Sequence, residues 1–223
     1  MLEQNWKVAP VIGLALLGVL SGCATWSGDT PRIAVPGPEP LQVDVPPGHS
    51  IVLELPTGEA TVVAGAIDHV DIAVTVRCPD DSARCRKRAS KAELVSTISS
   101  NRTRFSLDGS LGSGAEVVSQ VRVPEDRVLE VRMKYGALTV QNHAADLDVR
   151  MTAGDVDIVS AESQTGAVEL KASVGEASLR SDGGRAEGRR PLLVGSKVEW
   201  DGIGQNAVNA RVRFGDVQLR LLP

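Results

Sequence analysis

Aromatic residues are scarce in this sequence and make up 3% of its 223 residues. Proteins that bind single-stranded nucleic acid stack the bases on aromatic side chains, and many sugar-binding clefts use aromatic rings in a similar way. An excess of basic residues is also missing, because 24 lysines and arginines are outnumbered by 28 aspartates and glutamates. The composition therefore argues against a nucleic-acid partner and weakens the case for an aromatic sugar-binding shelf.

Motifs of common hydrolases and metalloenzymes are absent as well. His49, His69 and His143 lie far apart in the sequence. Neither His-Glu-x-x-His nor Gly-x-Ser-x-Gly occurs. No second cysteine pair or nearby histidine completes the four ligands of a zinc site. We therefore expect a protein that is not an enzyme and that uses no cofactor or metal.

One pattern is repeated four times in the second half of the chain. It reads apolar-x-apolar-x-apolar-x-x-Gly-x-apolar-x-apolar, and the copies start at Leu129, Leu147, Val168 and Val208 and contain Gly136, Gly154, Gly175 and Gly215. A side-chain period of two predicts strands. A unit of about twenty residues that recurs predicts stacked rungs. The expected fold is therefore all-β, a β-helix-like solenoid, with a β-sandwich of stacked hairpins as the alternative.

Each copy of the pattern changes parity at its glycine. In the first copy the apolar residues are odd-numbered up to Met133 and even-numbered from Leu138. An unbroken strand would turn its second half to the wrong face, so the switch predicts a bulge or corner at the glycine. We also expect a degraded copy over residues 192–200 and an outlying relative over residues 57–62.

The N-terminus resembles the signal of a bacterial lipoprotein. A short apolar run over residues 8–20 has the form of a secretory signal peptide. The following Leu20-Ser21-Gly22-Cys23 resembles a lipobox, which implies cleavage before Cys23 and acylation of that cysteine, including a palmitate-like chain. The alternative is an ordinary signal peptide with a chance cysteine. Several acyl chains would anchor the protein stably to a membrane. Ala24, rather than an aspartate, follows the cysteine, and in a host with two membranes this resembles the signal for the outer membrane.

These features divide the chain into three predicted parts. Residues 1–22 are the expected signal peptide. Residues 23–49 hold the lipidated cysteine and a segment rich in proline and glycine, expected to be an extended tether. Residues 50–223 form the expected β-repeat domain.

Cys78 and Cys85 remain after Cys23 is assigned to lipid. Outside the cytoplasm two nearby cysteines form a disulfide more often than they stay free. We therefore expect a Cys78–Cys85 disulfide.

Two pairs of aspartates form the candidate ligand face. Asp146 and Asp148 flank Leu147, while Asp155 and Asp157 flank Val156. Alternation turns each pair away from the core, and stacked rungs could align them into an oxygen-rich ladder for Ca²⁺. The alternative, which we favour, is a solvated charged face, because the spacing matches no known Ca²⁺ loop. Paired carboxylates also occur in glycoside hydrolases.

From residue 51 onward the chain resembles the bacterial β-strand-repeat family of unknown function named "putative adhesin". The residues that carry the resemblance are Gly58-Glu59-Ala60-Thr61-Val62, Val121-Arg122-Val123-Pro124 leading into Leu129-Glu130-Val131, Gly154-Asp155-Val156, Gly202-Ile203-Gly204 and Gly215-Asp216-Val217. The resemblance implies a β-helix-like solenoid and a role in the cell envelope.

The sequence therefore predicts a non-enzymatic, lipid-anchored envelope protein that presents a β-solenoid surface for adhesion or scaffolding. Its expected partners are the membrane, through the lipid, and an envelope protein or glycan. Two alternatives remain open: a carbohydrate-active enzyme built on a β-helix, and an envelope assembly or stress component that binds another protein through an uncapped end.

Overall fold

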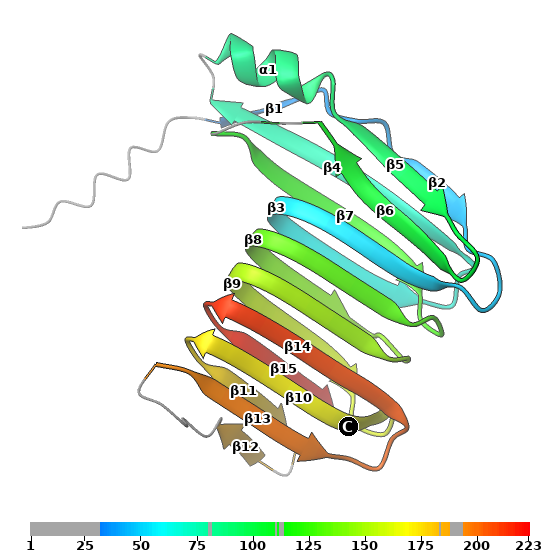
Figure 1. Ribbon diagram of the computed structural model, residues 1–223, viewed down its shortest axis with the longest axis vertical. Helices are drawn as coiled ribbons and strands as arrows, with labels where there is room; N and C mark the ends of the chain where they lie inside the picture. Colours follow the sequence, from blue (N-terminus) through cyan, green and yellow to red (C-terminus); the bar gives the residue numbers. More distant parts are fainter. Residues whose placement is uncertain (1–31, 80–81, 110, 112–113, 183, 188–193) are drawn as a thin grey trace, which may run out of the picture.

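The computed structural model describes residues 32–79, 82–109, 111, 114–182, 184–187 and 194–223 (Figure 1). Strands dominate this part, as the sequence predicts. The elements are β1 (Arg32–Val35), β2 (Leu41–Asp44), β3 (Ser50–Gly65), β4 (His69–Pro79), α1 (Ala83–Ala89), β5 (Glu93–Ile98), β6 (Arg102–Asp108), β7 (Glu116–Pro124), β8 (Leu129–Gln141), β9 (Leu147–Ala161), β10 (Thr165–Val174), β11 (Ala177–Ser181), β12 (Gly184–Glu187), β13 (Ser196–Asp201), β14 (Asn206–Phe214) and β15 (Val217–Leu222). Among the described residues no helix has the length and hydrophobicity to cross a membrane.

The long strands β3, β8 and β9 pair in parallel, and the glycines of the repeat align in register. Gly58 lies opposite Gly136, and Gly136 lies opposite Gly154. All three glycines have positive φ angles between 113° and 132°, which residues with a Cβ rarely adopt. Buried side chains switch from odd to even numbers at these glycines. The predicted corner is confirmed, and so is the outlying copy at residues 57–62.

The glycine corners fold the sheet into two layers. The front layer in Figure 1 runs β5–β6–β3–β8–β9–β14–β10–β13, with the first halves of β3, β8 and β9. The back layer runs β4–β7–β3–β8–β9–β15–β11–β12, with the second halves of the same strands, and β1 and β2 both pair with β4. The core lies between the layers and includes Phe105, Ile51, Leu53, Leu129, Leu138, Ile158, Leu170, Leu179 and Leu219.

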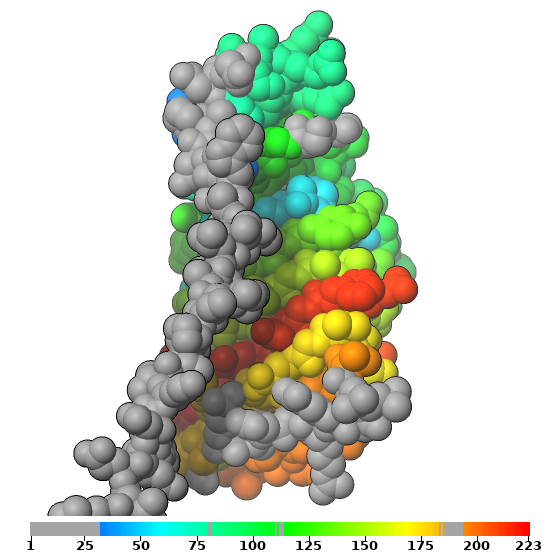
Figure 2. Space-filling model, turned by 90° about the vertical axis from the view of Figure 1, so that its left-hand side faces the viewer, coloured from blue at the N-terminus to red at the C-terminus, as the bar shows by residue number. Residues whose placement is uncertain are grey.

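The spatial order of the copies differs from their order in the chain. The last copy, β14 and β15, lies between β9 on one side and β10 and β11 on the other. Figure 2 shows this order at the corner edge, where the red C-terminal strands separate β9 from the yellow β10. The rungs that follow β9 therefore do not stack in chain order. The copies resemble one another, so their apolar pattern does not determine which copies become neighbours.

The degraded copy predicted at residues 192–200 is not a parallel rung. Its described part forms β13, which pairs antiparallel with β10 and places Val198 opposite Leu170. An antiparallel strand buries alternate residues just as a parallel strand does, so the pattern alone does not give its direction.

The predicted tether over residues 23–49 is not a simple extended linker in its described part, residues 32–49. Residues 32–35 form β1 and residues 41–44 form β2, and both strands pair antiparallel with β4. Leu41 and Val43 pack against the core. These strands are only four residues long and are flanked by prolines. An alternation of apolar and polar residues could therefore not be recognised in the sequence. The predicted signal peptide and Cys23 lie outside the described residues.

The predicted disulfide is confirmed. Cys78, near the end of β4, is bonded to Cys85 in α1, with their Cα atoms 5.8 Å apart. Both cysteines are buried, and the Ser82 side chain caps the helix by accepting a hydrogen bond from the Cys85 N–H at 3.3 Å. The disulfide therefore attaches the short helix to one end of the two-layer sheet.

Removing this disulfide should lower stability without changing the fold. We expect the double variant Cys78→Ala/Cys85→Ala to lose about 2 kcal/mol of unfolding free energy, because the closed loop is short. The measurement is urea unfolding followed by far-UV circular dichroism. Reduction of the unmutated protein should reproduce the loss, and an unchanged midpoint after both treatments would contradict the expectation.

Candidate functional site

The structure separates the two predicted aspartate pairs. Asp148 lies in the first half of β9, on the outer face of the front layer, and Asp157 lies in the second half, on the outer face of the back layer. Asp146 precedes β9, and Asp155 directly follows the corner glycine. The four carboxylates therefore do not form one ladder, and they do not share the single face on which the possible Ca²⁺ ladder depended.

Three of these aspartates make contacts within the sheet. Asp146 Oδ1 accepts a hydrogen bond from the Ala207 N–H at 2.8 Å, and Asp155 Oδ1 accepts one from the Asp216 N–H at 3.4 Å. Asp148 Oδ2 lies 2.7 Å from Arg150 Nη2. These carboxylates connect neighbouring strands or pair with a neighbouring cation, which is a structural role.

A different group of residues comes within metal-ligand distance in the described part of the chain. Potential ligand atoms of Asp44, Asp68 and His69 lie within 4.8 Å of one another, where the end of β2 meets the turn between β3 and β4. The hydrogen bond to Asp68 raises the pKa of His69, and the same bond lowers the pKa of Asp68. Both aspartates are exposed, and an exposed acidic group of this kind is common on protein surfaces.

The most regular charged feature is a row of cations on the outer face of the front layer. Its members lie in register on the adjacent strands β8, β9, β14, β10 and β13 and are Arg132, Arg150, Arg211, Lys171 and Lys197. We call this set the basic row. Neighbouring strands are about 4.8 Å apart, so the row spans about 19 Å. The five strands that carry it belong to the layer nearer the viewer in Figure 1.

A row of acids runs beside the basic row, two residues away on each strand. It consists of Glu130, Asp148, Glu169 and Glu199, with Asn209 in the β14 position. We call this set the acidic row. The rows are connected by ion pairs, of which Arg132–Glu130, Arg150–Asp148 and Lys197–Glu199 are the shortest, all at 2.7 Å. Arg211 is 3.5 Å from Glu169.

Ion pairs between the rows shift the pKa of Glu130 and of Lys197 toward the charged form. Partial burial acts to raise the pKa of Glu130, but the hydrogen bond from Arg132 and the charges of Arg132 and Arg150 outweigh it and lower that pKa. The hydrogen bond to Glu199 raises the pKa of Lys197. Exposed pairs of this kind contribute only about 0–1 kcal/mol each to stability, so the rows are not needed to hold the fold together.

A groove lies at the β3–β8–β9 end of the basic row, and we call it the front groove. Its volume is about 710 Å³. Arg132, Lys134 and Arg150 line it from β8 and β9, while Glu54 and Ser106 line it from β3 and β6. Three cations therefore border a concave part of the front face.

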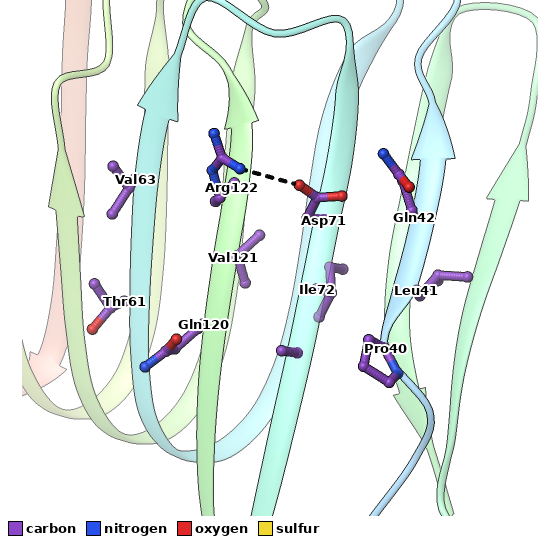
Figure 3. Close-up of a pocket in the computed structure, with 11 residues that line it drawn as sticks. Pro40, Leu41, Gln42, Thr61, Val63, Asp71, Ile72, Gln120, Val121 and Arg122 are labelled. Carbon is purple, nitrogen blue, oxygen red and sulfur yellow. Dashed lines mark ion pairs between the residues drawn. The ribbon is translucent and has the colours of Figure 1, made fainter.

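A second groove of about 700 Å³ lies on the outer face of the back layer (Figure 3). Leu41 from β2 and Val63 from β3 line its sides, and Asp71 and Arg122 form an ion pair across β4 and β7 at 3.6 Å. Asp71 and Arg122 both line this groove and pair with each other. The groove therefore presents less unpaired charge than the front groove.

His143 is the buried ionisable group next to the candidate aspartates. Its side chain is 5% exposed, and its Nε2 lies 3.3 Å from the carbonyl oxygen of Asp146. The Nδ1 atom has no hydrogen-bond partner among the described residues. Burial lowers the pKa of His143 from its ordinary value of 6.5, and the Asp146 carbonyl opposes this shift without cancelling it.

His143 should make the protein less stable in mild acid. Because its pKa is lower in the folded state, the unfolded chain binds the proton more readily, and the unfolding free energy should fall as the pH drops below 6.5. The measurement is urea unfolding from about pH 8 to about pH 5. His143→Gln should lose less stability over this range than the unmutated protein.

His69→Gln is the control for the pH experiment, because the expected change has the opposite sign. The raised pKa of His69 gives a stabilisation that is present below 6.5 and lost as the pH rises. Its removal should therefore steepen the acid loss slightly. Identical pH profiles for His143→Gln and the unmutated protein would contradict the role of His143.

The basic row was missed by the sequence analysis, although the repeat carries its signal. The first two copies read apolar-acid-apolar-base-apolar, as in Leu129-Glu130-Val131-Arg132-Met133. The third copy has Glu169 and Lys171 at the same positions, and the fourth has Asn209 and Arg211. Aligning the outward-facing positions of the copies would have predicted the rows. The contribution of β13 depends on its antiparallel direction, which the sequence does not give.

Comparison with known proteins gives distant structural similarity only. No protein-family model matches the chain, and no curated protein matches it. A solved structure described as a "putative cell adhesion protein" from Clostridium sporogenes is 11% identical, with a TM-score of 0.46 over 83% of this chain and 100% of that one. A "putative adhesin" from Bacteroides fragilis is 10% identical, with a TM-score of 0.20 over 84% of this chain and 99% of that one. Similarity at this level does not establish a function.

Proposed function

We propose that this protein is a non-enzymatic, lipid-anchored protein of the cell envelope, whose solenoid-like stack of strands presents a surface for adhesion or scaffolding. The observation that carries the proposal is the front face, where the basic and acidic rows continue in register across adjacent strands. A long face of repeated side chains suits an extended partner, as in other repeat proteins. The lipobox-like sequence ending at Cys23 supports the membrane attachment.

The contacts of the candidate carboxylates favour this function over a carbohydrate-active enzyme. Acid–base hydrolysis needs two carboxylates facing one bond. Asp148 and Asp157 lie on opposite outer faces, and Asp146 and Asp155 accept backbone hydrogen bonds. A hydrolytic activity on envelope polysaccharide that is lost in Asp155→Ala/Asp157→Ala would overturn the proposal.

The anchor and the adhesive role are tested in the organism that carries the protein. Cells producing the full chain should retain it in the membrane fraction, and Cys23→Ser should release it or leave it unprocessed. Metabolic labelling with an alkyne fatty acid should mark the unmutated chain alone. Cells that lack the protein should attach less to surfaces coated with envelope material from the same species, and equal attachment would contradict the adhesive role.

A further inference from the structure

We propose that the front face binds a linear polysaccharide that carries carboxylate groups, with its chain lying along the basic row. The inference rests on the proposed adhesive function and names the class of its ligand. Three features of the face support it: the excess of cations, the periodicity of the basic row and a pair of exposed aromatic rings beside it.

The front face is positive although the whole chain is negative. The front-layer parts of β8, β9, β14, β10 and β13 carry seven lysines and arginines and five aspartates and glutamates. Lys134 and Arg213 add to the basic row on the side nearer the corner glycines. The net charge of the chain is −4, so these cations are concentrated locally. Such a face attracts a polyanion.

The cations retain the capacity to bind an external carboxylate. In the described part of the chain Lys171, on β10 beside the edge strand β13, has no ion pair, and its side chain is exposed. An arginine has five N–H donors, so Arg150 can contact Asp148 and still offer donors outward. Because the existing pairs are exposed and weak, a ligand carboxylate can share them at little cost.

The regular spacing of the cations in the basic row favours a ligand whose carboxylates also recur at a regular spacing. Cations recur at each strand, about 4.8 Å apart. This distance is comparable to the length that one sugar residue adds to an extended polysaccharide, so acidic sugars could place successive carboxylates against successive strands. The front groove beside Arg132 and Arg150 gives the chain a concave site at one end of the row.

Exposed aromatic rings lie along the corner beside the basic row. Tyr135 and Phe214 occupy the position before the corner glycine on β8 and β14, and both are in register with Ala153 between them. Their exposures are 56% and 47%. Two strand spacings separate them by about 10 Å. The guanidinium of Arg213 lies 5.3 Å from the centroid of the Phe214 ring and restrains it.

This pairing of rings and cations distinguishes a glycan from other polyanions. The apolar faces of sugar rings pack on aromatic side chains, while the carboxylates pair with lysine and arginine. The chain has few aromatic residues, and among the described ones Tyr135 and Phe214 are the exposed pair. A polyanion without rings would use the basic row alone.

The test is a titration of the purified full chain, in detergent micelles, with polygalacturonate fragments of defined length. Binding should weaken as NaCl is raised from about 50 mM to about 500 mM, because the charges are exposed. Arg150→Gln/Arg211→Gln removes two neighbouring cations of the basic row and should weaken binding about tenfold or more. Tyr135→Ala/Phe214→Ala should weaken it about tenfold.

A matched control lies on the other layer. Arg180 on β11 and Arg220 on β15 are also exposed neighbours in register, but they face out from the back layer. Arg180→Gln/Arg220→Gln makes the same change of charge and should leave the affinity within about twofold of the unmutated value. Far-UV circular dichroism and urea midpoints of all variants show that they are folded.

Four results would overturn the inference. They are no binding of polygalacturonate, equal loss of binding in the two arginine double variants, equal affinity for polyglutamate with no effect of Tyr135→Ala/Phe214→Ala, and preferential binding to vesicles of anionic lipid. None of them affects membrane retention through Cys23 or cell attachment, so failure of this inference is distinguishable from failure of the proposed function.

Discussion

Gly154→Ala should abolish the native fold or destabilise it by about 4 kcal/mol or more. Gly154 lies in the middle of the stacked corner glycines, and its φ angle is 128°. A Cβ added there would overlap the carbonyl group of Gly136 on the neighbouring strand, so relief of the clash would require the backbones to separate. The measurement is urea unfolding of the variant, or the soluble fraction after expression if it does not fold.

Gly184→Ala separates the clash from the backbone strain. Gly184 has nearly the same φ, 130°, but no described atom lies within 4 Å of an added Cβ. We expect this control to lose only about 1–2 kcal/mol, the cost of a left-handed conformation for alanine. Equal losses in the two variants would mean that the close stacking of the glycines is not what fixes the corner.

Leu170→Ala should have the next largest effect, a loss of about 3 kcal/mol. Leu170 is fully buried in β10, opposite Ala210 of β14 on one side and Val198 of β13 on the other. Shortening it leaves a cavity between the layers, in the half of the protein where the order of strands departs from the order in the chain. Urea unfolding monitored by far-UV circular dichroism measures the loss.

Lys171→Ala is the matched control for the Leu170 variant. Lys171 is the next residue on the same strand, and its side chain is exposed on the opposite face. Its truncation should change the unfolding free energy by less than about 0.5 kcal/mol. A similar loss in both variants would contradict the inward orientation of Leu170 and, with it, the placement of β10 beside β14.

The corner is the part of the fold that the sequence predicts best. Parity of apolar residues reports which face is buried, and the switch at Gly136 or Gly154 has few explanations other than a bend. The neighbours of each strand are less predictable, because Leu147 and Val208 belong to similar copies and either could lie beside Val168. Short edge strands such as β1 and β2 contain too few residues for alternation to be recognised.

The candidate site was predicted less well than the fold. Asp155 and Asp157 were candidate ligand residues because paired carboxylates can bind a cation. In the structure Asp155 supports the corner instead, by accepting a backbone hydrogen bond. The basic row depends on register between strands that are far apart in the sequence, such as β9 and β14. Alternating acid and base within a strand also resembles ordinary surface charge until the copies are stacked.

The position of β14 and β15 has a consequence for how the protein matures. These strands follow β10 and β11 in the sequence, yet among the described strands only they pair with both β9 and the pair β10 and β11. During synthesis from the N-terminus, β9 and the pair β10 and β11 therefore cannot join through these pairings until β14 and β15 have been made. Loss of β14 and β15 by premature termination or proteolysis would expose strand edges on β9 and on β10 and β11, where unwanted pairing between molecules begins.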